Sequence, residues 1–126
     1  MKEGYGMNDT QLGAVEARFA DLIWERQPIA STDLVKLCEE IFSWKKSTTY
    51  TVLKRLCDKG IFRSEKGSVQ ALLSREDYYA MQSERFVETT FRGSLPAFLA
   101  AFTSRKNLSV EEVEQIRHMI DHYEEG

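Results

Sequence analysis

The fold of this 126-residue chain is decided by the stretch KSTTYTVLKRLCDK, which runs from Lys46 to Lys59 and is followed by Gly60. Apolar residues recur along it at spacings of three and four, which predicts a helix with one inward side. That side holds Thr49, Val52, Leu53 and Leu56. Gly60 stands where a glycine commonly follows the end of a helix.

The opposite side of this predicted helix is short, polar and basic, with one aromatic ring. It consists of Thr48, Thr51 and Arg55, flanked by Ser47, Tyr50 and Lys54. Hydroxyl and guanidinium groups donate hydrogen bonds to phosphates and base edges, and a threonine methyl can contact the methyl of thymine. Free N–H groups at the start of the helix favour a nearby phosphate. This side suits the major groove of DNA; an ordinary solvated helix face is the alternative.

The distribution of charge supports the first interpretation. The chain carries a net charge of −3, but residues 41–70 hold seven basic and two acidic side chains. Residues 71–126 hold six basic and ten acidic side chains. A basic segment on an acidic chain is typical of a DNA-facing surface joined to a separate partner-facing half.

The segments around this helix complete a recognisable order. Upstream, amphipathic periodicity predicts a helix over residues 12–25 that Pro28 ends, and a second helix capped by Ser31 or Thr32. Downstream, short strands are expected at residues 61–65 and 69–73, joined by a turn at 66–68. Two helices, a recognition helix and a hairpin make a winged helix-turn-helix, so the fold class is mainly α (α+β).

The remainder reads as three helices. The first opens at Ser74 with a capping-box pattern, Gly93 and Ser94 break it, and Ser109 with Glu112 caps the last. About 50 residues build a self-sufficient core with difficulty, yet this part is rich in bulky apolar side chains, which indicates an interface. We expect a homodimer interface made by Phe91, Leu95, Phe98, Leu99, Phe102, Val113, Ile116 and Ile120.

Packing of these helices back onto the winged helix is the alternative to a dimer. The expected domains are a winged-helix DNA-binding domain over residues 1–73 and a helical dimerisation domain over residues 74–126.

The sequence gives little support to an enzymatic function. There is no nucleophile–base pair or glycine-rich phosphate loop, so we expect neither an enzyme nor a cofactor.

Metal binding and membrane insertion are not expected either. His118 and His122 stand four residues apart with no second anchoring segment, and Cys38 and Cys57 read as reduced core residues. No run approaches the length of a membrane span, and residues 1–6 lack the apolar core of a signal peptide. A cytoplasmic protein is therefore expected.

The chain resembles the BlaI/MecI/CopY family of penicillinase, methicillin-resistance and copper-responsive repressors. The most specific match runs from Trp44 to Leu56 and ends with Lys59 and Gly60. Residues 12–25, 93–102 and 108–109 add further matches in the same order. The resemblance implies a homodimer that binds an inverted-repeat operator in double-stranded DNA and represses transcription.

By position, the resemblance implies DNA contacts from Ser47, Thr48, Tyr50, Thr51 and Arg55. With the neighbouring basic residues Lys46 and Lys54, and Lys66 in the wing, these form the expected DNA-binding set. The wing residues 67–71 lack the family's Gly-Arg pair and tyrosines, so Lys66 is the one wing residue assigned. A winged helix that binds a protein partner instead of DNA is the second interpretation.

The resemblance also implies a regulatory input. In antibiotic-responsive members, a membrane sensor protease system inactivates the repressor by cleavage before a phenylalanine, a place taken here by Ala101 and Phe102. The family has asparagine where this chain has Ala101, so the protease input stays open. Copper sensing is not expected, because residues 122–126 contain no cysteine cluster.

Overall fold

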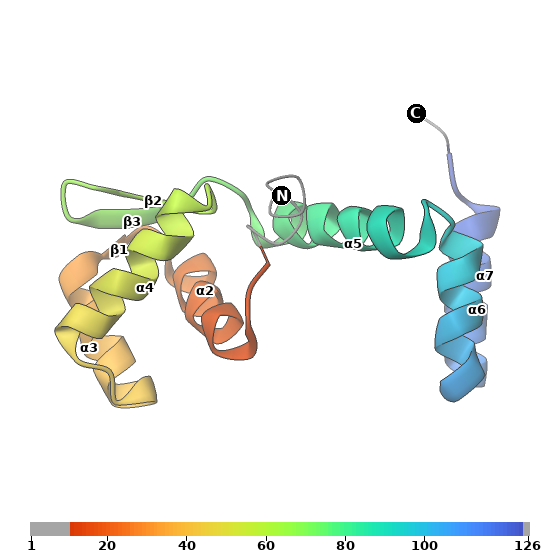
Figure 1. The fold of residues 1–126 in the computed structure, drawn as a ribbon, viewed down its shortest axis with the longest axis horizontal. Coiled ribbons are helices and arrows are strands. Elements are labelled where there is room, and N and C mark those ends of the chain that lie inside the picture. The colour runs from red at the N-terminus through yellow and green to blue at the C-terminus, as the bar shows by residue number, and fades with distance from the viewer. Residues whose placement is uncertain (1–10, 125–126) are drawn as a thin grey trace. The chain divides into compact units, whose positions relative to one another are not determined.

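The computed structural model describes residues 11–124 and is mainly helical, with one small antiparallel sheet (Figure 1). The chain divides into two compact units, one ending at Arg85 and the other beginning at Phe86, inside a single long helix. Among the described residues, no helix is long and apolar enough to cross a membrane.

The N-terminal unit has the predicted winged-helix order. Its elements are α2 (Ala14–Arg26), β1 (Ile29–Ala30), α3 (Ser31–Phe42), α4 (Lys46–Asp58), β2 (Phe62–Glu65) and β3 (Ser68–Ala71). The sheet order is β1-β3-β2, with Ile29 paired to Val69 and Phe62 to Ala71. The sequence did not predict β1, because two residues are too few to show an alternating pattern.

The ends of the helices confirm one prediction and correct another. Gly60 follows α4 with a φ of +83°, its N–H donates to Cys57 O at 2.9 Å, and the Ile61 N–H donates to Leu56 O at 3.2 Å. This is the hydrogen-bond pattern of a Schellman motif.

The predicted cap of α3 at Ser31 or Thr32 is wrong, because α3 begins directly after β1. The cap residue is Ala30, whose methyl side chain cannot accept a hydrogen bond from the helix N–H groups. Ser31 is the first helical residue. Ala30 is already paired with Ser68, and the Ser31 N–H donates to Gly67 O at 2.9 Å. The wing therefore satisfies the first of the backbone N–H groups that have no partner within the helix.

One hydrophobic core fills the N-terminal unit. Its fully buried side chains include Phe19, Ile23, Leu34, Cys38, Leu56, Ile61, Phe62 and Val69. Trp24 contacts the rings of Phe62 and Tyr78, and its Nε1 donates to Leu73 O at 2.9 Å. Tyr78 belongs to α5 (Arg75–Phe91) and is 2% exposed, so the first turns of α5 pack on the winged helix. The domain boundary after residue 73 stays a prediction.

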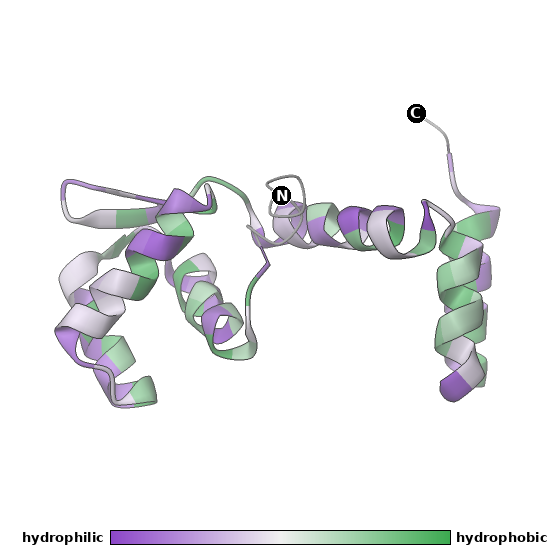
Figure 2. Cartoon of the chain, viewed as in Figure 1, coloured by the Kyte–Doolittle hydropathy of each residue, from purple (hydrophilic) through white to green (hydrophobic). Residues whose placement is uncertain are grey.

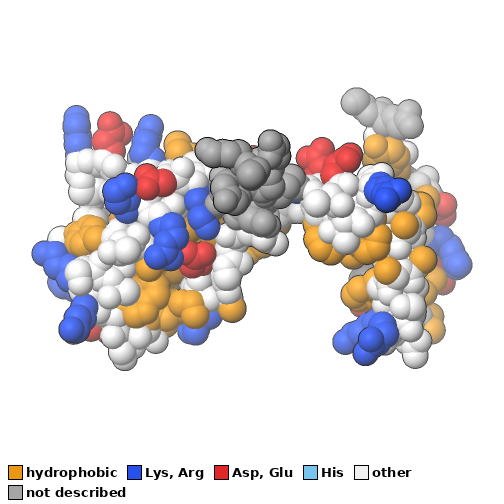
Figure 3. Space-filling model, in the orientation of Figure 1, with side chains coloured by type: hydrophobic (Ala, Val, Ile, Leu, Met, Phe, Trp, Pro, Cys, Tyr) orange, Lys and Arg blue, Asp and Glu red, His pale blue; other side chains and the backbone are white. Residues whose placement is uncertain are grey.

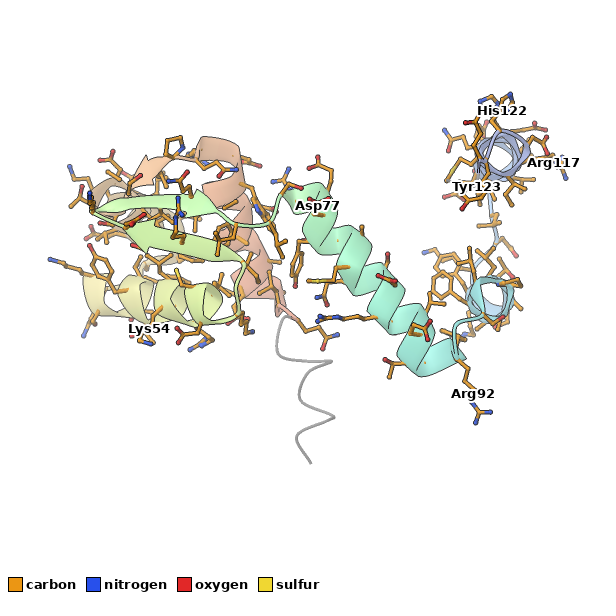
Figure 4. The ribbon with its side chains drawn as sticks, turned by 90° about the horizontal axis from the view of Figure 1, so that it is seen from above. Lys54, Asp77, Arg92, Arg117, His122 and Tyr123 are labelled. Carbon is orange, nitrogen blue, oxygen red and sulfur yellow. The ribbon has the colours of Figure 1, made fainter. Side chains whose placement is uncertain are left out.

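The C-terminal unit contains the end of α5, α6 (Leu95–Arg105) and α7 (Val110–Asp121). Helices α6 and α7 run along nearly the same direction, since both stand upright in Figure 1 and both are seen end-on in Figure 4. The predicted capping box at the start of α7 is confirmed, because Ser109 Oγ accepts from the Glu112 N–H at 3.0 Å and the Glu112 carboxylate accepts from the Ser109 N–H at 2.9 Å. Most of α6 is hydrophobic (Figure 2), yet neither α6 nor α7 buries a residue.

Candidate nucleic-acid interface

Helix α4 separates its side chains as its sequence predicts. Thr49, Val52, Leu53 and Leu56 are buried against the core of the unit. Six side chains of the expected DNA-binding set are exposed: Lys46, Ser47, Thr48, Thr51, Lys54 and Arg55. Lys54 lies on the side of α4 that faces away from the sheet (Figure 4). The exposed side is therefore accessible to a large partner.

The first half of α4 presents unpartnered hydroxyl groups. The side chains of Ser47, Thr48 and Thr51 form no hydrogen bond to any residue between 11 and 124. The backbone before Lys46 is extended, and Lys45, the cap residue, offers no side-chain bond to the first N–H groups. Donors at this end of the helix are thus available to phosphates or base edges.

Tyr50 connects this surface to the wing. Its ring is half-buried, and Tyr50 Oη donates to Ser31 Oγ at 3.3 Å. Ser31 in turn bonds through its N–H to Gly67 O in the turn between β2 and β3. The start of α3, the middle of α4 and the tip of the wing are therefore linked by two hydrogen bonds.

The wing tip is a tight turn whose geometry exposes Lys66. Lys66 and Gly67 have φ values of +54° and +75°, as a two-residue hairpin turn of type I′ requires. Lys66 is exposed, and nearby Arg63 lies 3.6 Å from Glu65. Lysine and arginine side chains gather over α4 and this hairpin in the space-filling view (Figure 3).

The second half of α4 differs, because its cations have carboxylate partners. Lys54 Nζ lies 3.0 Å from Asp58 Oδ2 on the same helix. Arg55 Nη1 donates to Glu16 Oε2 at 2.7 Å, and Lys59 Nζ lies 3.8 Å from Glu16 Oε1. Sequence reasoning missed Glu16, because no periodic pattern links positions 39 residues apart.

Glu16 is held ionised by these contacts. Burial by itself would raise the pKa of Glu16, but the hydrogen bonds from Arg55 and from the Gly13 N–H, with the charge of Lys59, hold the pKa below its usual value.

The two cysteines lie in or beside the core. Cys38 is a buried core residue as predicted, and Cys57 is half-buried. Burial raises the pKa of both thiols, which keeps them protonated.

The expected interface residues of the C-terminal unit fall into two groups. Five are half-buried, namely Phe91, Phe98, Leu99, Val113 and Ile116, and three are exposed, namely Leu95, Phe102 and Ile120. Phe98 makes ring contacts with Phe86, Phe91 and Phe102 at centroid distances of 5.6–6.1 Å. These contacts order one aromatic cluster and leave much of its surface uncovered.

Two apolar hollows lie along α6 and α7. One of about 330 Å³ is lined by Phe98, Leu99, Phe102 and Met119 among others, and one of about 250 Å³ by Val113, Ile120 and neighbours. Ile116 and Leu108 line both. Sequence reasoning missed Leu108, which stands alone between two helices and so shows no periodicity.

The expected cleavage bond and the two histidines also lie in this unit. The bond between Ala101 and Phe102 lies within α6, and both side chains are exposed. The rings of His118 and His122 lie 4.0 Å apart on α7. Within residues 11–124, no three histidine, cysteine or acidic side chains are grouped so that they could hold a metal ion.

Comparison with known proteins covers both units. The family model of the penicillinase repressor matches residues 12–122. The methicillin resistance regulatory protein MecI of Staphylococcus epidermidis is 19% identical over 115 residues, which cover 88% of this chain and 94% of that protein.

Proposed function

We propose that this chain, which belongs to the penicillinase repressor family and is therefore a DNA-binding transcriptional repressor rather than an enzyme, acts as a homodimer on an inverted-repeat operator. In this proposal α4 enters the major groove. The observation that carries it is the exposed, unpartnered hydroxyl side formed by Ser47, Thr48 and Thr51 beside a buried apolar side. Such a side offers donors to base edges and methyl groups to thymine.

Charged groups around this side would hold the DNA backbone. Lys46 is exposed at the start of α4, and Lys66 is exposed at the tip of the wing. The link from Tyr50 through Ser31 to Gly67 keeps wing and helix in one arrangement. Contacts to phosphate fix the position of a protein on the duplex, while base contacts select the sequence.

The homodimer is supported by the uncovered apolar surface of α6 and α7. An exposed stripe of phenylalanine, leucine and isoleucine is costly for a monomer in water, and a second copy of the same stripe would cover it. Two linked recognition helices would bind two half-sites with an avidity about 10²–10⁴ above that of one. An inverted repeat is the DNA symmetry that matches a two-fold protein dimer.

A titration of the full chain against duplex DNA tests the proposed reading surface. The probes are a duplex selected by binding from the source genome and a scrambled duplex of the same composition. Thr51→Ala should weaken binding to the selected duplex by about 1–3 kcal/mol if it contacts a base, with little effect on the scrambled one.

Lys46→Ala should weaken binding to both duplexes and lower the slope of log affinity against log salt by about 0.9. Lys106→Ala removes the same charge after α6 and is the matched control. Failure of the parent protein to bind any duplex at low salt would contradict the proposal and favour a protein-binding winged helix.

We also propose that a sensor protease cleaves the bond between Ala101 and Phe102. A protease binds its substrate as an extended strand, so the last turns of α6 would have to unwind first. Because α6 buries no residue, its unwinding removes little packing. A fragment ending at Ala101 in induced cells supports this input, and an intact chain during derepression contradicts it.

A further inference from the structure

Glu16 connects the start of α2 to Arg55 of α4 and to Lys59, which follows that helix. Its Oε2 accepts from Arg55 Nη1 at 2.7 Å, and its Oε1 lies 3.8 Å from Lys59 Nζ. The Glu16 side chain is 18% exposed, whereas the Arg55 side chain is 52% exposed. The carboxylate is therefore an inner partner that holds an outer cation.

Further bonds fix this carboxylate in place. The Gly13 N–H donates to Glu16 Oε1 at 3.3 Å, and Lys59 Nζ donates to Gln11 O at 3.0 Å. The Lys54–Asp58 pair on the same helix has side chains 77% and 65% exposed, so solvent screens it and it contributes little. Of the ion pairs of α4 within the described residues, those of Glu16 are thus the ones that would persist beside DNA.

The cations held by Glu16 contribute less to non-specific DNA binding than free cations would. Non-specific affinity for DNA rises with the number of phosphates that lysine and arginine neutralise, independently of sequence. A cation already held by a fixed carboxylate gains less from a phosphate, and that carboxylate repels the backbone. Specificity, by contrast, depends on the hydroxyl side at the start of the helix.

We propose that Glu16 is a specificity-determining positioning residue that holds Arg55 and Lys59 back from the DNA backbone. This inference rests on the proposed function and deepens it. It assigns Arg55 to α2 rather than to the base-reading set that its position in the sequence suggests. Binding then relies more on the hydroxyl side of α4 and less on charge.

The test compares Glu16→Gln with the parent protein on the selected and scrambled duplexes across a range of salt concentrations. Glutamine keeps an acceptor for the Gly13 N–H but removes the charge that retains the cations. At 0.1 M salt the variant should bind the scrambled duplex about eightfold more tightly for each cation released, with a slope steeper by about 0.9. Affinity for the selected duplex should rise less, because base contacts already fix the register there.

A double variant and a charge control complete the design. Glu16→Gln with Arg55→Gln should bind the scrambled duplex about eightfold less tightly than Glu16→Gln alone, because the released guanidinium is gone. Glu114→Gln, on an exposed part of α7, changes the net charge equally and should not alter the ratio of the two affinities. If Glu16→Gln does not fold, Glu16→Asp should change the affinity for the scrambled duplex in the same direction by a smaller factor, because its shorter side chain loses reach to Arg55 but keeps the charge.

The outcomes separate the inference from the function it rests on. An unchanged ratio of the affinity for the selected duplex to that for the scrambled duplex, in a folded Glu16 variant, would overturn the inference, as would weaker binding to both duplexes. A lower ratio, with a steeper dependence of log affinity on log salt, would support it. If the parent protein binds neither duplex, the proposed function fails, and this inference fails with it.

Discussion

The two units of this chain place their apolar side chains differently. In the N-terminal unit, residues such as Phe19, Leu34 and Phe62 have no exposed surface. In α6 and α7, no residue is buried, and the apolar side chains of Phe102 and Ile120 keep 45% and 66% of their surface exposed. The first unit has a closed hydrophobic core, whereas the second leaves its apolar side chains partly uncovered.

This difference separates two tasks within one short chain. A rigid core fixes α4, the start of α3 and the wing in one arrangement, which recognition of a base sequence requires. If a second copy covers the apolar surface of α6 and α7, as proposed, the stability of the C-terminal unit depends on protein concentration.

The largest effect is expected from truncating one leucine in each unit. Leu34→Ala should lower the free energy of unfolding of the N-terminal unit by about 2–5 kcal/mol, because Leu34 is fully buried. Leu99→Ala is the matched change at a half-buried position of α6 and should alter that value by less than about 0.5 kcal/mol. Tryptophan fluorescence in a urea titration measures this, since both tryptophans, Trp24 and Trp44, lie in the N-terminal unit. Equal losses of unfolding free energy in the two variants would mean that the two units unfold together in one transition.

The second effect concerns assembly. Ile116→Asp places a charge between the two hollows of α6 and α7, where a second copy would bury it at high cost. The variant should be monomeric at micromolar concentration by light scattering and should bind an inverted repeat about 100-fold more weakly or worse. His118→Asp adds the same charge to an exposed position of α7 outside both hollows and should remain a dimer. A dimeric Ile116→Asp protein would place the interface elsewhere.

The third effect tests whether the start of α5 belongs to the N-terminal unit. Burial, mainly, raises the pKa of Tyr78 from 10.0 to about 12. The folded state therefore keeps this proton where the unfolded state has lost it, so the stabilisation is full below pH 10 and is lost as the pH rises toward 12. Between pH 8 and pH 11 the loss amounts to about 1.4 kcal/mol and should be absent from Tyr78→Phe, which keeps the ring. Urea titrations at pH 8 and pH 11 measure it, and identical pH dependence in both proteins would contradict the burial of this hydroxyl.

Periodic patterns predicted much of the molecule, and contacts between distant segments account for the rest. The inward side of α4, the turn at Gly60 and the capping box at Ser109 follow from local spacing, and the structure confirms them. The strand β1 and the partnership of Glu16 with Arg55 join positions far apart in sequence, so no local pattern could indicate them. The cap of α3 was mispredicted for the same reason, since Ala30 pairs with Ser68 in the wing and the helix begins at the next residue.

The account depends most on α4 being the element that meets operator DNA. A photo-crosslinking amino acid placed at Thr48, on the exposed side of α4, tests this directly in the full chain. The same substitution at Glu40, on an exposed position of α3, is the control. Irradiation with the selected duplex should give a crosslink from position 48 that unlabelled selected DNA abolishes and scrambled DNA does not. Crosslinks from position 40 alone, or from neither position while binding persists, would contradict the account.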